Sequence, residues 1–215
     1  SNVQYALHID QLRNALNELA RINNNFTGNI KIVLHSKKGM PGSLYAFFIP
    51  HFYPNQYMYM NGVDADLFKA ERTDPNIKKM HMDIAGRISS FISTSDIYEA
   101  LLVDDQNCIT EGSKTNVFFV RGNIVYTAGA DRVLLGITRQ KVLELCKIHQ
   151  VKIIERAIPV TSMADFDAAF FTGTSPKVLP IKRIANAQYA VTNIVMRRLM
   201  AAYDNLMNQY IALHR

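Results

Sequence analysis

The chain has 215 residues, of which 48% are hydrophobic and 20% charged, a composition that is typical of a globular protein. Its net charge is +6, but the basic residues are scattered, so the composition does not indicate a nucleic-acid-binding protein. No apolar run approaches the about 20 residues that a membrane-spanning helix needs, which argues against a membrane protein.

The first third of the chain alternates helical and strand patterns. Ile9, Leu12, Leu16 and Leu19 follow helical spacing and predict an amphipathic helix. Strands are predicted at 30–34, 44–49 and 63–70, whereas the Tyr- and Met-rich stretch 50–61 shows no clear pattern. A break near residues 73–76 predicts two domains, a smaller one at 1–74 and a larger one at 75–215.

The rest of the chain is rich in short apolar runs that are separated by turn residues. Helices are predicted over the apolar stripe 84–92, after Gly136, near 163–165 and over 194–210. Strands are predicted at 100–103, 116–120, 124–127, 151–154, 168–172 and 178–184. The many hairpins indicate an α+β fold rather than a doubly wound sheet.

The two cysteines, Cys108 and Cys146, lie far apart in the sequence and lack the spacing of metal ligands. We expect both to be free thiols in a reducing cytoplasm, and we expect no metal site because no cluster of His and Cys is present.

The most informative stretch is Glu111-Gly112-Ser113-Lys114-Thr115-Asn116, which leads directly into an apolar strand. Alone, it would be read as a hairpin turn with a solvated glutamate. Its neighbours along the chain favour another interpretation, because a lysine pair lies upstream at Lys78-Lys79 and two small polar loops lie downstream at 136–138 and 173–175. A pyridoxal 5′-phosphate enzyme needs this set: a Schiff-base lysine, an acid for the pyridine nitrogen and a phosphate cradle.

Lys78 is the candidate for the covalent link to the cofactor, although a solvated lysine is the alternative. Glu111 would keep the pyridine nitrogen protonated, with Asn116 and Ser113 holding its carboxylate in place. Gly112 would allow a tight turn beside the ring.

Two loops could bind the phosphate. Gly136-Ile137-Thr138 opens a predicted helix, whose free N–H groups and positive dipole end attract anions. Thr138 adds a hydroxyl, although a helix cap would explain it as well. Gly173-Thr174-Ser175 follows a strand and could serve both the phosphate and a substrate carboxylate, the alternative being an ordinary turn.

Taken together, these segments resemble the class IV (fold-type IV) pyridoxal-phosphate enzymes, which include branched-chain and D-amino-acid aminotransferases and 4-amino-4-deoxychorismate lyases. The resemblance is carried by Asn76-Ile77-Lys78 and by the segments 98–104, 109–119, 133–139 and 171–181. It implies a two-lobed homodimeric protein with a small, here incomplete, N-terminal α/β lobe and a larger β-rich C-terminal lobe.

The resemblance also assigns roles to individual residues. Lys78 would hold the cofactor covalently and move the proton, and Glu111 would pair with the pyridine nitrogen. Ile137, Thr138 and Thr174 would hold the phosphate, and the backbone at Thr174-Ser175 would receive the substrate carboxylate.

The chain departs from the family pattern at three places. Members carry several dozen residues before the first helix seen here, including a phosphate-binding arginine without a counterpart in this chain. Asp83 stands where branched-chain aminotransferases have a tyrosine, and we expect it to be a helix-surface aspartate. The strand 44–49 lacks the arginine and histidine of the D-specific enzymes, and its aromatic residues suit an apolar substrate.

The sequence therefore predicts an aminotransferase that moves an amino group between an apolar L-amino acid and a 2-oxo acid, without a nucleic-acid or membrane partner. Two alternatives stay open, a lyase that releases pyruvate from aminodeoxychorismate and a non-catalytic family member.

Overall fold

The computed structural model describes residues 8–25, 28–35, 42–70 and 82–213. The chain packs as two compact units, Ser1–Tyr53 and Pro54–Arg215. The division thus falls before β3 (Val63–Lys69), whereas the sequence-based domain division lies after it, at 74/75. The reason is that β3 pairs with two strands of the large sheet and therefore packs with the second unit.

The first unit contains one helix and a two-stranded sheet. Its elements are α1 (Ile9–Ile22), β1 (Asn29–His35) and β2 (Ser43–Ile49), as the apolar spacing predicts. The strands are antiparallel, in a register that runs from Asn29 opposite Ile49 to His35 opposite Ser43. Opposed residues share a face of a sheet, so one face carries only apolar side chains, from Ile30, Ile32, Leu34, Leu44, Ala46 and Phe48.

The second unit carries the remaining described elements. Its helices are α2 (Gln56–Asn61), α3 (Met82–Ser95), α4 (Ile137–Ile148), the 3₁₀ helix η1 (Val160–Asp165) and α5 (Ile194–Leu213). Its strands, besides β3, are β4 (Glu99–Val103), β5 (Cys108–Gly112), β6 (Asn116–Arg121), β7 (Ile124–Thr127), β8 (Lys152–Glu155), β9 (Ile158–Pro159), β10 (Ala168–Gly173), β11 (Lys177–Ile184) and β12 (Ala187–Gln188). This mixture confirms the α+β fold class.

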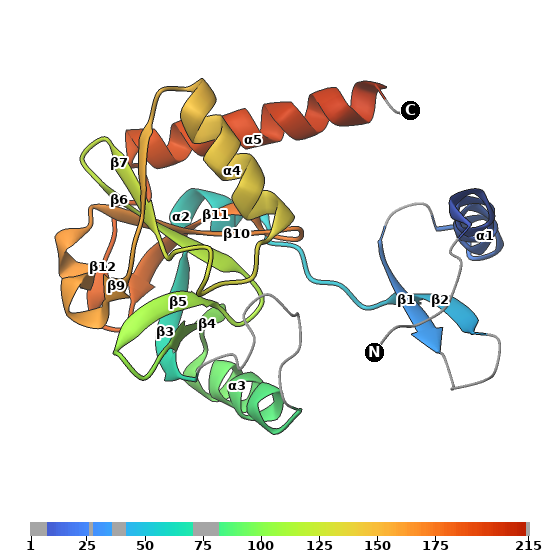
Figure 1. The fold of residues 1–215 in the computed structure, drawn as a ribbon, viewed down its shortest axis with the longest axis horizontal. Coiled ribbons are helices and arrows are strands. Elements are labelled where there is room, and N and C mark those ends of the chain that lie inside the picture. The colour runs from blue at the N-terminus through green and yellow to red at the C-terminus, as the bar shows by residue number, and fades with distance from the viewer. Residues whose placement is uncertain (1–7, 26–27, 36–41, 71–81, 214–215) are drawn as a thin grey trace. The chain divides into compact units, whose positions relative to one another are not determined.

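Strands of the second unit form one mixed sheet in the order β8-β7-β6-β10-β11-β3-β4-β5-β9, with β12 beside β11. In the described chain, the pairs β11–β3, β3–β4 and β7–β8 are parallel and the other pairs are antiparallel. Four strands separate β5 from β6 along this path, yet only residues 113–115 connect them in the chain. The sheet must therefore curl back on itself, and the connection between β5 and β6 lies where the curl closes (Figure 1).

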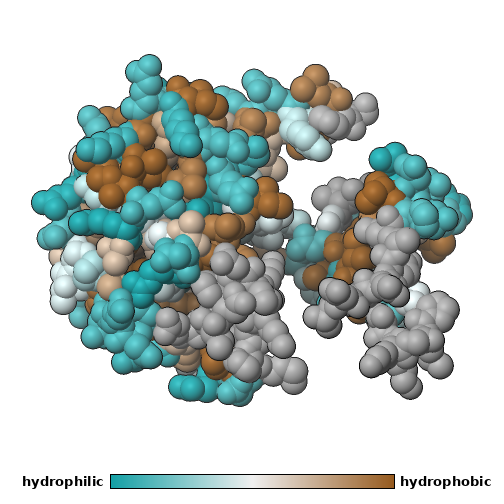
Figure 2. Space-filling model, viewed as in Figure 1, coloured by the Kyte–Doolittle hydropathy of each residue, from teal (hydrophilic) through white to brown (hydrophobic). Residues whose placement is uncertain are grey.

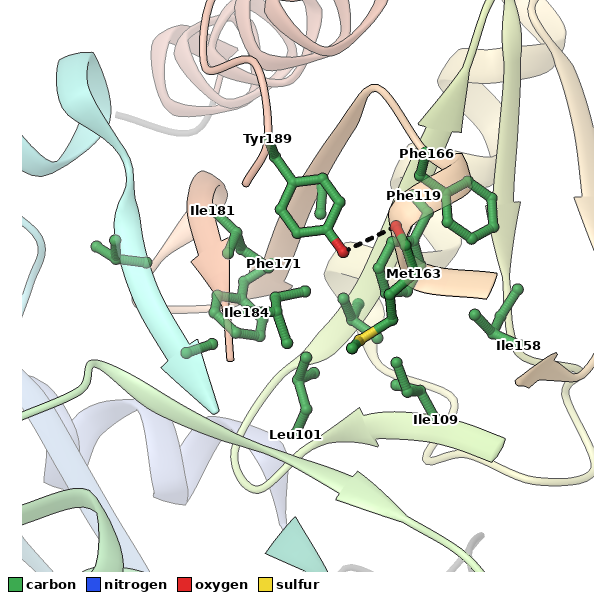
Figure 3. Close-up of a cluster of buried hydrophobic side chains, with 14 of the residues drawn as sticks. Leu101, Ile109, Phe119, Ile158, Met163, Phe166, Phe171, Ile181, Ile184 and Tyr189 are labelled. Atoms are coloured by element: carbon green, nitrogen blue, oxygen red, sulfur yellow. Dashed lines mark hydrogen bonds between the residues drawn. The ribbon is translucent and has the colours of Figure 1, made fainter. Parts of the chain in front are cut away.

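The two faces of the curled sheet bury different cores because successive side chains of a strand point to opposite faces. On β6, Val117 and Phe119 join the inner core, whereas Phe118 and Val120 join the outer one. The inner core also contains Phe166 and Tyr189, and the Tyr189 hydroxyl donates to the Met163 carbonyl (Figure 3).

The outer face of the sheet is covered by helices. α4 and α5 pack over β6, β10 and β11, through Val142, Leu145, Cys146, Met196, Leu199 and Tyr203. α3 covers β4 on another side, where Ile88 meets Ala100 and Leu102 (Figure 1). The visible face of the molecule mixes hydrophilic and hydrophobic residues (Figure 2). None of the helices within the described ranges has the length and apolar character needed to cross a membrane.

Candidate active site

Glu111 lies on β5, and its side chain is only 2% exposed. The backbone N–H of Leu134 donates to its Oε2 at 3.0 Å, and the Asn116 side-chain amide donates to the same oxygen at 3.2 Å. The Asn116 amide also donates to the Leu134 carbonyl at 2.8 Å. One asparagine thus ties the carboxylate to the segment that leads into α4, in agreement with the supporting role expected for Asn116.

The turn between β5 and β6 has a glycine, Gly112, at its first position. The Gly112 N–H donates to the Thr115 carbonyl at 2.8 Å, which closes the turn. A Cβ placed on Gly112 would overlap the Thr115 hydroxyl and would also press on Glu99. The Thr115 side chain would have to move to admit a larger residue, so glycine lets the turn close with Glu111 and Asn116 on either side of it.

The loop 136–138 forms the N-terminus of α4. Gly136 is the N-cap residue and supplies no side-chain cap, so the first N–H groups of the helix receive no hydrogen bond from a capping side chain. Gly136 also faces Asn116 closely: a Cβ there would overlap the Asn116 Oδ1. Ile137 is 75% exposed, whereas Thr138 is buried with its hydroxyl 3.3 Å from the Tyr203 hydroxyl of α5.

The loop 173–175 forms the turn between β10 and β11 and lies near the start of β6. Thr172 is the cross-strand partner of Asn116, and a Cβ on Gly173 would touch the Thr115 methyl group. Thr174 is exposed, and Ser175 is half-buried. Lys177 follows the turn and forms an ion pair with Asp204 of α5 at 2.8 Å.

The two loops are therefore fixed by neighbouring residues of one helix. Tyr203 contacts Thr138, and Asp204 binds Lys177. Sequence reasoning did not identify this part of α5, since its residues look like ordinary core and surface positions of a closing helix. Of the expected site residues, the structure brings Glu111, Gly136 and Gly173 around the β5–β6 turn. Lys78 lies outside the described residues.

A second buried carboxylate, also missed by sequence reasoning, lies behind this turn. Glu99 at the start of β4 is 2% exposed, and the Ser113 hydroxyl donates a short hydrogen bond to it. Burial raises the pKa of Glu99, while the bonds from Ser113, from the Lys114 backbone and from its neighbour Ala100 act in the opposite direction. Asp83 lies in the first turn of α3 and is exposed, as expected for a helix-surface aspartate.

The fold matches that of solved aminotransferase structures. A branched-chain amino acid aminotransferase from Thermotoga maritima, described as putative, is 26% identical and superimposes with a TM-score of 0.79. The match covers 95% of this chain and 74% of that one. A 4-amino-4-deoxychorismate lyase from Legionella pneumophila, also described as putative, has the same TM-score at 20% identity, over 96% of this chain and 79% of that one.

The chain belongs to the class IV aminotransferase family: residues 2–184 match the family described as Amino-transferase class IV. Among curated relatives, the branched-chain-amino-acid aminotransferase of Pseudomonas aeruginosa is 32% identical over 112 residues, which cover 51% of this chain and 36% of that protein. The D-alanine aminotransferase of Bacillus licheniformis is 27% identical over 186 residues, or 81% of this chain and 65% of that protein. The chain thus spans between about a third and two thirds of these relatives.

Class IV aminotransferases use pyridoxal 5′-phosphate, and the described residues fit this group. An uncapped helix N-terminus suits its phosphate, and a buried carboxylate suits its pyridine nitrogen. Thr172 offers a further indication: its hydroxyl is buried, and no described residue bonds to it. It shares the sheet face of Asn116, because the two are opposed in the ladder, so a polar ligand on that face would satisfy it.

Proposed function

We propose that this chain is the cofactor-binding part of an aminotransferase that moves an amino group between an amino acid and a 2-oxo acid. The observation that carries the proposal is the buried Glu111 carboxylate, fixed by Asn116 and the Leu134 N–H beside the uncapped N-terminus of α4. When bound, pyridoxal phosphate supplies the electron sink for the reaction.

The residues of the chain would bind and orient this cofactor. Glu111 would keep the pyridine nitrogen protonated, and its burial makes that charge interaction stronger than it would be in water. The backbone N–H groups of Ile137 and Thr138 would hold the phosphate from one side. Gly136 would contribute by its small size, because its own N–H donates to the Leu134 carbonyl at 2.8 Å.

The second loop would complete the site. Gly173 and Thr174 would reach the phosphate from the β10–β11 turn, and the backbone of Thr174 and Ser175 would receive the substrate carboxylate. Lys78 would provide the covalent attachment and would take up the proton that leaves the α-carbon of the substrate, in keeping with its register in the family pattern.

An apolar L-amino acid is the substrate that we propose. The support is the strand β2, whose side chains include Leu44, Phe47 and Phe48 and which lacks basic residues that would hold a D-amino acid. The relative from Pseudomonas aeruginosa is named for branched-chain amino acids, which are of this chemical class.

We also propose a cytoplasmic homodimer. The apolar residues Ile32, Leu34, Tyr45 and Phe47 of the first unit are exposed in the single chain, and closed twofold symmetry is the commonest arrangement of soluble oligomers. Static light scattering of the purified protein should give twice the mass of 24.4 kDa. A fully active monomer would contradict this part of the proposal.

The decisive experiment follows the bound cofactor through half a reaction. The protein is loaded with pyridoxal phosphate, and leucine is added without any 2-oxo acid. An aminotransferase keeps the amino group on the cofactor, so the yellow absorbance should disappear in proportion to the protein. A 2-oxo acid should restore it.

The same sample locates the attachment residue. Borohydride reduction and peptide mapping should find the adduct on Lys78, and Lys79→Ala is the matched control that should leave it unchanged. An adduct on Lys79 would refute the assignment. Persistent absorbance with every common L-amino acid, together with pyruvate release from aminodeoxychorismate, would favour the lyase. Persistent absorbance without either activity would favour a non-catalytic protein.

A further inference from the structure

Glu99 is a buried acid for which the proposed chemistry has no use. It lies at the first position of β4, in a strand whose five residues are all buried. A carboxylate is costly to bury unless hydrogen bonds compensate its lost hydration. Such a residue in a strand otherwise made of Ala, Leu and Val therefore needs a specific explanation.

Among the described residues, the hydrogen-bond donors to Glu99 other than its neighbour Ala100 lie in the turn that follows Glu111. The Ser113 hydroxyl and the Lys114 backbone N–H both donate to its carboxylate. The Ser113 N–H donates to the Ala100 carbonyl at 2.9 Å, which joins the same turn to the same strand end. The carbon chain of Glu99 packs directly beneath Gly112, as the space around that glycine shows.

The turn in question separates Glu111, the proposed partner of the pyridine nitrogen, from Asn116, which holds its carboxylate in place. Glu111 precedes it, and Asn116 follows it and donates to Glu111. A change in the path of the turn would shift the two ends relative to each other. The hydrogen bond between them is 3.2 Å long, near the upper end of the normal range, so a small shift would break it.

We propose that Glu99 is a positioning residue for Glu111: by binding Ser113 and Lys114 it fixes the turn that sets the distance between Glu111 and Asn116. Glu99 acts through the turn and need not touch the cofactor. The consequence for cofactor binding rests on the proposed function, whereas the consequence for the turn does not.

The β4–β5 hairpin offers a matched control at its other end. Asp104 is 1% exposed and, like Glu99, binds backbone N–H groups, those of Gln106 and Cys108 at 2.8 and 3.0 Å. It is therefore an equally buried carboxylate with a turn of its own. If cofactor affinity fell only because the hairpin was damaged, it should fall in both Asp104→Asn and Glu99→Ala.

The first measurement uses the protein without cofactor. Hydrogen exchange should become at least about tenfold faster at 112–116 in Glu99→Ala, because the turn loses its carboxylate anchor. Asp104 also accepts from the Arg132 guanidinium at 2.6 Å, so in Asp104→Asn the faster exchange should be confined to 104–108 and to the neighbourhood of Arg132. Unchanged exchange at 112–116 in a folded Glu99→Ala protein would overturn the proposal, whatever the cofactor does.

The second measurement is cofactor affinity, followed by absorbance and by quenching of tyrosine fluorescence. Glu99→Ala should weaken binding by about tenfold to a hundredfold, the usual effect of removing the hydrogen-bonding partner behind a functional ligand. Glu99→Gln retains an acceptor oxygen and should restore most of the affinity. Asp104→Asn should stay within about threefold of the original protein.

Equal losses of cofactor affinity in Glu99→Ala and Asp104→Asn would overturn the proposed positioning role and would show that Glu99 only stabilises the hairpin. Ser113→Ala serves if Glu99→Ala does not fold, because it removes one donor from the same contact and should give an intermediate effect. Failure of the unmodified protein to bind pyridoxal phosphate would refute the proposed function, whereas the exchange result would still decide whether Glu99 fixes the turn.

Discussion

Replacing Gly136 by alanine tests whether Asn116 is the link between the buried carboxylate and the start of α4. The backbone of Gly136 has a φ of −62° and a ψ of 141°, values that alanine adopts without strain. The added methyl group would nevertheless overlap the Asn116 Oδ1. The Asn116 amide must then rotate, which breaks its bonds to Leu134 and Glu111.

The expected cost follows from these two hydrogen bonds. The 2.8 Å bond to the Leu134 carbonyl joins neutral groups and contributes about 1 kcal/mol, whereas the 3.2 Å bond to Glu111 involves a charge and contributes about 1.5–3 kcal/mol. Gly136→Ala should therefore lower the free energy of unfolding by about 2–4 kcal/mol. Urea denaturation of the cofactor-free protein measures this change.

Two controls make the test specific. Gly86 lies within α3, with nothing near enough to meet an added methyl group, so Gly86→Ala should raise stability by about 0.5–1 kcal/mol. In a protein that already carries Asn116→Ala, Gly136→Ala should lower the free energy of unfolding much less, because the clashing side chain is gone. The same cost in both backgrounds would refute the reasoning.

Three further predictions concern other buried groups. Glu111→Ala should lower turnover by about two orders of magnitude but cofactor occupancy much less, as steady-state kinetics and bound-cofactor absorbance would show; equal losses would indicate a structural role. Arg139 is buried and donates to Ala128 and Glu155, so Arg139→Ala should lower the free energy of unfolding in urea by about 3 kcal/mol or more. Glu155→Gln retains an acceptor and should lower it by about 1 kcal/mol. Burial raises the pKa of Cys146 from 9.0 to about 11, so the unfolded chain ionises first. Stability should therefore fall between pH 9 and 11, by up to about 3 kcal/mol, and a Cys146→Ala protein with the same fall would contradict this.

Most elements could be predicted because their apolar residues follow a helical or alternating period. β5 (Cys108–Gly112) was not recognised as a strand. Its sequence mixes Thr110 and Glu111 with apolar residues, yet all five residues are buried. The curl of the sheet buries both faces of β5, and this long-range closure leaves no periodic signal in five residues. The short helix α2 was missed for another reason: its start depends on the Asn55 side chain, which accepts from the Met58 N–H.

In the candidate site, too, some residues could be predicted from the sequence and others could not. The loops 136–138 and 173–175 could be recognised because a glycine beside hydroxyl residues at a strand or helix end is a local signal. The partnership of Glu99 with Ser113 was not visible, because it depends on the register that places Leu101 opposite Gly112. The contact of Thr138 with Tyr203 spans 65 residues and depends on where α5 crosses α4.

The position of β3 in the sheet also has a consequence for the order of folding. β3 lies between β4, which follows it closely in the chain, and β11, whose residues Ile181 and Ile184 pair with Val63 and Ala65. During synthesis, one edge of β3 therefore stays open until more than a hundred further residues have been made. Contacts of such sequence separation form slowly, so closure of the sheet should limit the folding rate, and the nascent chain should need protection of that edge until β11 arrives.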